Sequence, residues 1–216
     1  MKIAVLGTGM VGNAIGTKLI ALGHEVKMGS RTNTNEKALA WVNSAGNNAS
    51  QGTFEDSAAF GEILFNCTKG QASVEVLQLA GEKNLNGKIL IDISNSLDFS
   101  KGMPPTLSIC NDDSLGETIQ RAFPDVKVVK TLNTMNCNLM VNASVVPGEH
   151  NVFVSGNDPD AKTEVKKLLN DFGWNENSII DLGDISTARG TEQLLPIWVR
   201  LMGTLGTPNF NFHIVK

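Results

Sequence analysis

Residues 2–31 read KIAVLGTGMVGNAIGTKLIALGHEVKMGSR, and this stretch decides the fold. The apolar run at 2–6 predicts a strand that is buried on both faces. Apolar residues then recur with the helical period and predict a helix that ends at Gly23. A second short strand is predicted at 25–29. This strand–helix–strand order predicts an α/β fold with a parallel sheet.

The turn after the first strand reads Gly7-Thr8-Gly9-Met10-Val11-Gly12. Gly7 permits a tight turn, Gly9 lets the backbone approach a pyrophosphate, and Gly12 lets the helix pack closely on the strand. The first N–H groups of the helix have no partner within it and attract phosphate. Because these glycines lie between a strand and a helix, with a second strand after them, we predict that the turn binds a dinucleotide.

The end of the second strand indicates which dinucleotide fits. An NAD site usually carries Asp or Glu there to bind the ribose 2′-hydroxyl, whereas residues 27–31 read KMGSR. The Ser30 hydroxyl can donate to a phosphate oxygen, and the planar guanidinium of Arg31 suits the same group. Lys37, a helical turn or so further on, would add a point charge. These residues predict a 2′-phosphate pocket and favour NADP(H) over NAD(H).

The rest of the chain repeats the same alternation of elements. Strands are predicted at 50–53, 61–67, 88–93, 126–131, 150–155 and 178–182, and helices at 36–45, 71–80, 114–122, 158–172 and 187–205. Pro196 predicts a break in the last helix, and 95–110 is the longest predicted loop. We predict a Rossmann-like, doubly wound parallel sheet in a single NADP-binding domain over 1–216. Its dinucleotide-binding core spans 1–145, and a short α/β C-terminal extension, 146–216, packs on the same unit.

Composition argues against several classes of protein. With 18 Lys and Arg against 22 Asp and Glu, the net charge of −4 argues against binding to nucleic acid. The three cysteines, Cys67, Cys110 and Cys137, lie far apart, so neither a disulfide framework nor a metal site is expected. No apolar run is long enough for a transmembrane helix, and the N-terminus does not read as a signal peptide. We expect a cytoplasmic protein with a small-molecule partner and no membrane partner.

The loops at the carboxyl ends of the strands are candidates for the reacting end of the site, because ligands of open parallel sheets bind there. After the fourth, fifth and sixth strands these loops carry small polar and amide side chains, namely Thr68, Ser94, Asn95, Asn133 and Thr134. Lys69 is a candidate for a cofactor contact or a proton donor. Lys130 lies within a strand and is harder to aim at a ligand.

These loops contain no evident catalytic acid or base, and the three histidines are scattered along the chain. Reduction of a ketone or imine usually needs a proton donor near the new hydroxyl or amine. Hydride transfer to a flavin-like ring depends chiefly on stacking and orientation. We therefore predict no catalytic residue of the acid–base type and favour hydride transfer by positioning.

Five stretches together carry a family resemblance: 2–12, 29–31, 92–95, 128–134 and 181–189. With them the chain resembles the NADP-dependent oxidoreductases that include coenzyme F420H2:NADP+ oxidoreductase, and is similar to the cytoplasmic oxidoreductase domain of the STEAP metalloreductases. The resemblance implies hydride exchange between NADP(H) and a flavin or a 5-deazaflavin such as F420. It implies a cofactor-binding role for Thr8, Gly9, Met10, Val11, Ser30, Arg31, Lys37, Thr68 and Lys69.

One position distinguishes the two groups. F420-dependent members carry a histidine in the loop after the sixth strand, where this chain has Asn133, as in the STEAP pattern. The STEAP proteins pass electrons onward through a membrane domain, and no apolar run among these residues is long enough to predict one. The resemblance therefore implies a soluble NADPH-dependent flavin or deazaflavin reductase. Relatives in this group are dimeric, so the apolar residues of 194–202 either cover the sheet or join a homodimer.

Two other functions fit the same residues. NADP-dependent carbonyl or imine reductases share the N-terminal fold but add a helical domain, for which the residues after 155 leave too little room. A non-enzymatic protein that senses NADP(H) would equally lack an acid or base. Turnover of a carbonyl or imine would indicate the first, and tight NADPH binding without hydride transfer the second.

Overall fold

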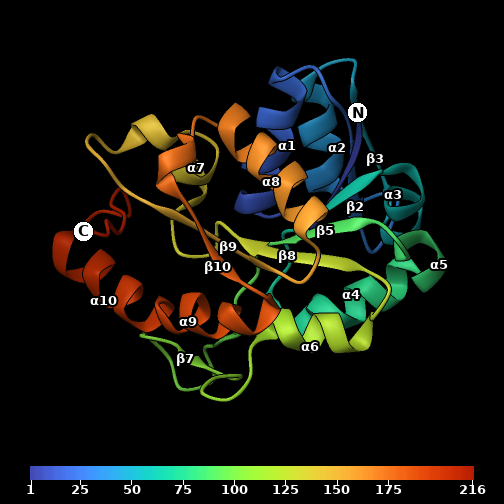
Figure 1. The fold of residues 1–216 in the computed structure, drawn as a ribbon. Helices are drawn as coiled ribbons and strands as arrows, with labels where there is room; N and C mark the ends of the chain where they lie inside the picture. The colour runs from blue at the N-terminus through green and yellow to red at the C-terminus, as the bar shows by residue number, and fades with distance from the viewer.

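A computed structural model describes all 216 residues and contains an eight-stranded sheet in the order β10-β9-β8-β5-β4-β1-β2-β3 (Figure 1). Its strands are β1 (Lys2–Leu6), β2 (Glu25–Ser30), β3 (Ala49–Thr53), β4 (Ile63–Asn66), β5 (Ile89–Asp92), β8 (Lys127–Thr131), β9 (Val152–Gly156) and β10 (Ile179–Gly183). The chain order reverses between β1 and β4, which is where doubly wound sheets bind their ligands. The predicted Rossmann-like α/β fold is confirmed.

Helices cover both faces of this sheet (Figure 1). One face carries α1 (Met10–Ala21), α2 (Glu36–Ala45), α7 (Cys137–Met140) and α8 (Pro159–Asp171). The other carries α3 (Phe54–Phe60), α4 (Ser73–Ala80), α5 (Glu82–Leu85), α6 (Leu115–Ala122) and α9 (Ala188–Gln193). The chain then continues through α10 (Leu195–Leu205) to the C-terminus. No helix combines the length and apolar character that crossing a membrane requires.

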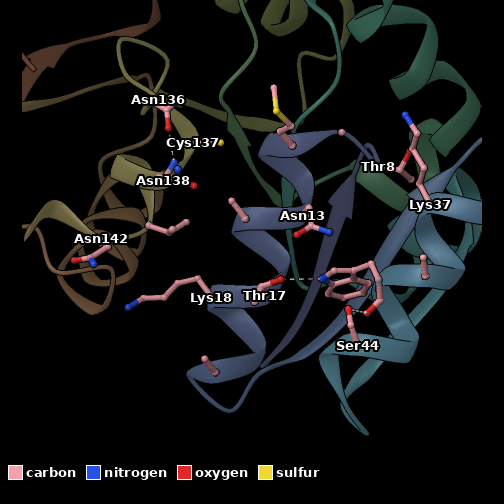
Figure 2. Close-up of a pocket in the computed structure, with 17 residues that line it drawn as sticks. Thr8, Asn13, Thr17, Lys18, Lys37, Ser44, Asn136, Cys137, Asn138 and Asn142 are labelled. Carbon is pink, nitrogen blue, oxygen red and sulfur yellow. Dashed lines mark hydrogen bonds between the residues drawn. The ribbon is translucent and has the colours of Figure 1, made fainter. Parts of the chain in front are cut away.

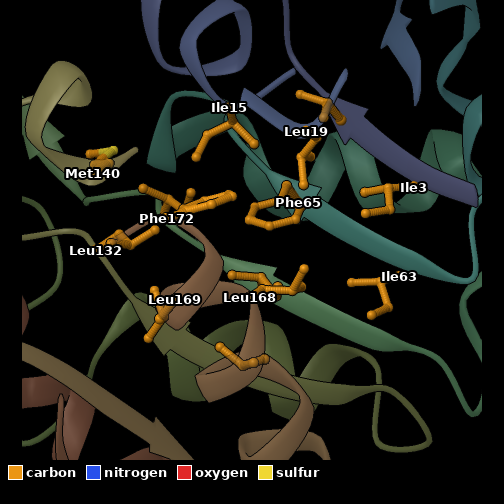
Figure 3. Close-up of a cluster of buried hydrophobic side chains, with 14 of the residues drawn as sticks. Ile3, Ile15, Leu19, Ile63, Phe65, Leu132, Met140, Leu168, Leu169 and Phe172 are labelled. Carbon is orange, nitrogen blue, oxygen red and sulfur yellow. The ribbon is translucent and has the colours of Figure 1, made fainter. Parts of the chain in front are cut away.

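Alternate residues of each central strand point to opposite faces and build two hydrophobic cores. On β1, Ile3 packs into the core beneath α1 and α8, and Ala4 into the core above α4 and α6. Figure 3 shows the first of these cores, where the rings of Phe65 on β4 and Phe172 after α8 have centroids 6.4 Å apart. Because both faces are covered, the central strands read as continuous apolar runs.

One strand departs from the predicted parallel order, since β9 runs antiparallel to β8. The connection over 132–151 contains only the short α7 and a 3₁₀ turn, η2 (Ala143–Val145), and no long crossover helix. The chain therefore re-enters the sheet from the edge that it has just left. The long helix α8 then crosses the sheet, and β10 is again parallel to β9.

Three further segments differ from or refine the sequence predictions. The predicted loop at 95–110 contains a small hairpin of β6 (Leu97–Asp98) and β7 (Thr106–Leu107). Helix α3 was not predicted, although Thr53 and Asp56 form a capping box at its start. The predicted break in the last helix is confirmed, because α9 and α10 meet at Leu194, with Pro196 in the first turn of α10.

Candidate cofactor-binding site

The glycine turn between β1 and α1 is shaped by backbone contacts that exclude side chains. Gly7 has a φ of +120°, and a Cβ there would lie 2.7 Å from the Cys67 carbonyl oxygen. A Cβ on Gly12 would lie 2.0 Å from the Gly7 carbonyl oxygen. A Cβ on Gly9 would meet no atom within 4 Å. The turn is thus closed at Gly7 and Gly12 and open to solvent at Gly9, as a site for an approaching pyrophosphate requires.

The predicted 2′-phosphate residues follow β2 at the same edge of the sheet. Ser30 is buried, and its hydroxyl donates to the Thr32 carbonyl oxygen at 2.6 Å. The Arg31 guanidinium is exposed and lies 4.0 Å from the Glu75 carboxylate of α4. Lys37 is exposed in the first turn of α2. The Arg31 side chain is therefore available to a charged ligand, at the expense of one weak surface ion pair.

A hollow of about 1120 Å³ runs along the outer face of α1, between α2 and α7 (Figure 2). Thr8, Gly9 and Met10 of the glycine turn line one end of it, and Lys37 lines it from α2. Its remainder extends down α1 past Thr17, away from the carboxyl ends of the strands. Only the end beside the glycine turn therefore adjoins the predicted dinucleotide site.

At the reacting end, a hydrogen-bonded network joins the ends of β4 and β5. Asn66 donates to Asp92 at 2.8 Å and accepts from the Thr68 hydroxyl at 2.7 Å. The Ser94 hydroxyl donates to the same Asp92 carboxylate at 2.6 Å. The predicted residues Thr68 and Ser94 are thus brought together, with their hydroxyls bonded to the protein. Lys69, beside them at the start of η1 (Gly70–Ala72), is exposed.

The loops after β5 and β8 meet through a reciprocal amide pair. Asn95 donates to the Asn133 carbonyl oxygen at 2.9 Å, and Asn133 donates to the Asn95 side-chain oxygen at 3.0 Å. Leu132 precedes this pair with a φ of +61°, a strained conformation for a branched residue. The Thr134 hydroxyl is buried and has no hydrogen-bond partner in the protein. The amides and this orphaned hydroxyl suit a ligand that offers its own donors and acceptors.

Beneath these loops, Lys130 is fully buried between two carboxylates. Its ammonium group lies 2.8 Å from Asp92 and 2.8 Å from Glu192 of α9. Burial alone lowers the pKa of Lys130, but the charges of Asp92 and Glu192 more than offset it and hold the pKa above its usual value. Sequence reasoning missed Glu192. The available signal was that Glu192 is the only acidic residue between 187 and 205, a segment that is mostly apolar.

The Cys67 thiol at this edge is unsuited to catalysis. Burial, with the nearby charge of Asp92, raises the pKa of the Cys67 thiol far above its usual value, so the thiol stays protonated. No group of three or more His, Cys, Asp or Glu side chains is arranged to hold a metal ion. The edge thus offers an anion-binding turn and orienting amides, which fit a dinucleotide.

Comparison with known proteins agrees with this geometry. A family model described as coenzyme F420-dependent NADP oxidoreductase matches residues 2–96, which hold the glycine turn, Arg31 and the loops after β4 and β5. The chain is also 53% identical, over the full length of both chains, to a protein of Arthrobacter sp. FB24 to which F420-dependent NADP-reductase activity has been ascribed. Its 1.70 Å crystal structure superposes with a TM-score of 0.95. The chain belongs to this family.

Two more distant matches, one in sequence and one in fold, add to this comparison. Rat metalloreductase STEAP3 is 27% identical over 202 residues, which are 91% of this chain but 38% of the relative. An imine reductase of Myxococcus stipitatus in complex with NADP+ is 18% identical and superposes with a TM-score of 0.64. That match covers 95% of this chain and 64% of the imine reductase, so the two share the fold.

Proposed function

We propose that this NADP-dependent oxidoreductase transfers a hydride between NADPH and a flavin or 5-deazaflavin acceptor. One observation carries the proposal. The edge of the sheet that holds the open turn at Gly9 and the exposed Arg31 also holds the Asn95–Asn133 amide pair and the exposed Lys69. Such an edge can bind and orient two planar partners but has little chemistry of its own, which is what hydride transfer between them requires.

The glycine turn and the end of β2 would hold the adenosine half of NADP(H). Free N–H groups at the start of α1 would donate to the pyrophosphate above Gly9. Arg31 would form a paired contact with the 2′-phosphate, and the Ser30 hydroxyl would turn from Thr32 to the same group. Lys37 would add charge from α2.

The amide-rich loops would orient the reacting half of the cofactor. Bound NADPH supplies the hydride at its nicotinamide ring. Asn95, Asn133 and Thr134 would present polar atoms to the carboxamide of that ring, because amides and a free hydroxyl satisfy both its donors and its acceptors. Lys130 is locked in ion pairs, so any proton that the acceptor needs would come from exposed Lys69 or from water.

The decisive experiment is a titration of the protein with NADPH and NADH, followed by oxidation of the tighter cofactor on addition of FMN, FAD, riboflavin or F420. We expect NADPH to bind more tightly and one of these acceptors to be reduced. Turnover of a carbonyl or cyclic imine instead would identify the protein as a reductase of those groups. Tight NADPH binding with no hydride transfer to any acceptor would identify a sensor.

Replacing Arg31 with alanine tests the 2′-phosphate assignment. We expect the affinity for NADPH to fall by about 1.5–3 kcal/mol, the range for hydrogen bonds to charged groups, while the affinity for NADH stays nearly unchanged. Thermal stability should not change, because Arg31 is exposed. Arg200→Ala, which removes an exposed arginine from α10, is the matched control and should change neither affinity. Equal losses for NADPH and NADH in Arg31→Ala would contradict the assignment.

We also propose that the protein is a cytoplasmic homodimer joined through α10. Of the apolar side chains of α10, Leu195 and Val199 are buried, whereas Ile197 and Leu205 are half exposed. Analytical ultracentrifugation should give twice the chain mass, and Ile197→Glu should shift the protein towards the monomer. A monomeric wild-type protein at micromolar concentration would contradict the proposal. The unpaired state of all three cysteines is compatible with a reducing compartment.

A further inference from the structure

The buried ion cluster of Lys130, Asp92 and Glu192 has no place in the proposed function. Its three side chains are almost fully inaccessible to solvent, and it carries one more negative than positive charge. Taking charges out of water costs more than an ion pair usually returns, and apolar residues can often replace such clusters without loss of stability. The cluster therefore calls for an explanation beyond stability.

The third hydrogen bond of Lys130 indicates which segment of the chain the cluster fixes in place. Besides its two carboxylate partners, the ammonium group donates to the Ser94 carbonyl oxygen at 2.5 Å. Ser94 precedes Asn95, whose side chain pairs with Asn133. Lys130 lies on β8, two residues before Leu132, and so ties the loop after β5 to the strand that leads into the loop after β8.

Each partner of Lys130 is itself fixed by other bonds. Asp92 accepts hydrogen bonds from Asn66 and from Ser94. Glu192 accepts from the backbone N–H groups of Leu115 and Gly116, at 2.8 and 3.0 Å, at the start of α6. The ammonium group is thus held from β5 and from α9, and its donation to Ser94 has little freedom to move.

Gly70 restricts the same loop from the other side. A Cβ on Gly70 would lie 2.1 Å from the Asn95 carbonyl oxygen, so the backbone of η1 packs directly on the Asn95 loop. The strained φ of Leu132 fixes the direction in which the chain leaves β8. The Asn95–Asn133 pair is therefore constrained from the loops after β4, β5 and β8.

We propose that Lys130, held by Asp92 and Glu192, is a positioning residue that fixes the Asn95–Asn133 amide pair for the nicotinamide half of the cofactor. The inference rests on the proposed function, because it assigns that half of NADP(H) to this edge. Lys130 does not touch the ligand. It acts through the Ser94 carbonyl and Asn95. Its replacement should therefore weaken binding of the nicotinamide half of NADP(H) and leave binding of the adenosine half unchanged.

The test compares NADPH with 2′,5′-ADP, a probe that contains the 2′-phosphate but no nicotinamide. Affinities for both are measured by isothermal titration calorimetry on the full-length wild type, Lys130→Met and Asn95→Ala. We expect Lys130→Met to weaken NADPH binding about 5- to 10-fold, the value of one ordinary hydrogen bond. Its affinity for 2′,5′-ADP should stay within about twofold of wild type, which corresponds to a few tenths of a kcal/mol.

Two further variants separate positioning from folding. Lys130→Met/Asp92→Asn keeps the net charge of the wild-type cluster and the acceptor oxygen that binds Asn66 and Ser94, and we expect it to show the same selective loss of NADPH affinity. In Lys130→Met/Asn95→Ala the loss should be no larger than in Asn95→Ala alone, because both changes act through one amide pair.

The outcomes distinguish this inference from the proposed function. A wild-type protein that binds neither NADPH nor 2′,5′-ADP would overturn the proposed function and the inference with it. Equal weakening of both ligands in Lys130→Met would overturn the inference alone, because it would reflect a general loss of structure. Additive losses in Lys130→Met/Asn95→Ala would likewise show that Lys130 does not act through Asn95.

Discussion

Replacing Gly9 with valine is expected to abolish binding of NADPH and NADH alike while the protein still folds. A Cβ at this position meets no protein atom within 4 Å, and the residue has a φ of −80° and a ψ of −174°, which valine adopts readily. The isopropyl group therefore enters only the space that a pyrophosphate would occupy. Gly9 is also the N-cap of α1, and valine caps helices poorly, so a stability loss of about 1 kcal/mol is expected.

Calorimetric titration and thermal denaturation together check this prediction. No binding of either cofactor should be detectable, and the Tm should fall by only about 2–4 °C. Gly203→Ala is the matched control, since a Cβ on this exposed helical glycine also meets no atom within 4 Å, and it should change neither affinity. Unchanged binding in Gly9→Val would exclude the glycine turn as the pyrophosphate site.

The parts of the fold that the sequence predicts are those in which a local signal agrees with the tertiary structure. Strand β1 and its turn follow from residues 2–12, because an apolar run and the steric needs of Gly7 and Gly12 are both local. Helix α8 follows in the same way from Asp158, which caps it, and from Pro159 in its first turn. The direction of β9 is missed although its signal is also local, because the connection over 132–151 has no long crossover helix of the kind that usually returns a strand in parallel.

The candidate site likewise contains features that the sequence predicts and features that it does not. Ser30, Arg31 and the polar loops are predictable, because a parallel sheet brings the carboxyl ends of its strands to one edge. Two other features are not predictable from the sequence. These are the burial of the Ser94 hydroxyl in the network around Asp92 and the left-handed conformation of Leu132. They arise from contacts between strands that are distant in sequence, and neither a serine nor a leucine predicts such a feature by its residue type.

Lys130→Met is expected to cause the largest loss of stability among the variants considered. Methionine fills most of the volume of the lysine side chain but leaves the carboxylates of Asp92 and Glu192 buried without a cation. Breaking a buried ion pair in this way costs about 3–5 kcal/mol, which would lower the Tm by about 6–20 °C in a domain of this size. A wild-type stability above the lower end of the usual range of about 5–15 kcal/mol leaves the variant folded at room temperature.

The double variant Lys130→Met/Asp92→Asn shows whether unpaired charge, and not lost packing, causes that loss, because the Asp92 oxygen that faces Lys130 has no other partner. Removing one carboxylate along with the cation should recover about 0.5–3 kcal/mol relative to Lys130→Met, the usual coupling energy of residues in one network. Urea denaturation of the wild type and both variants measures this difference. A double variant that is less stable than Lys130→Met would contradict the argument.

The difference in stability between the wild type and Lys130→Met should depend on pH, because the pKa of Lys130 is raised in the folded protein. A lysine whose pKa is higher in the folded than in the unfolded state contributes stability that is complete below the unfolded value of about 10.4. That contribution is lost as the pH rises through the folded value. The stability gap between wild type and Lys130→Met should therefore be constant from about pH 7 to 9 and narrow above about pH 10. A gap that instead widens between about pH 7 and pH 10 would mean that Lys130 is neutral in the folded protein, and that the cluster does not hold its charge.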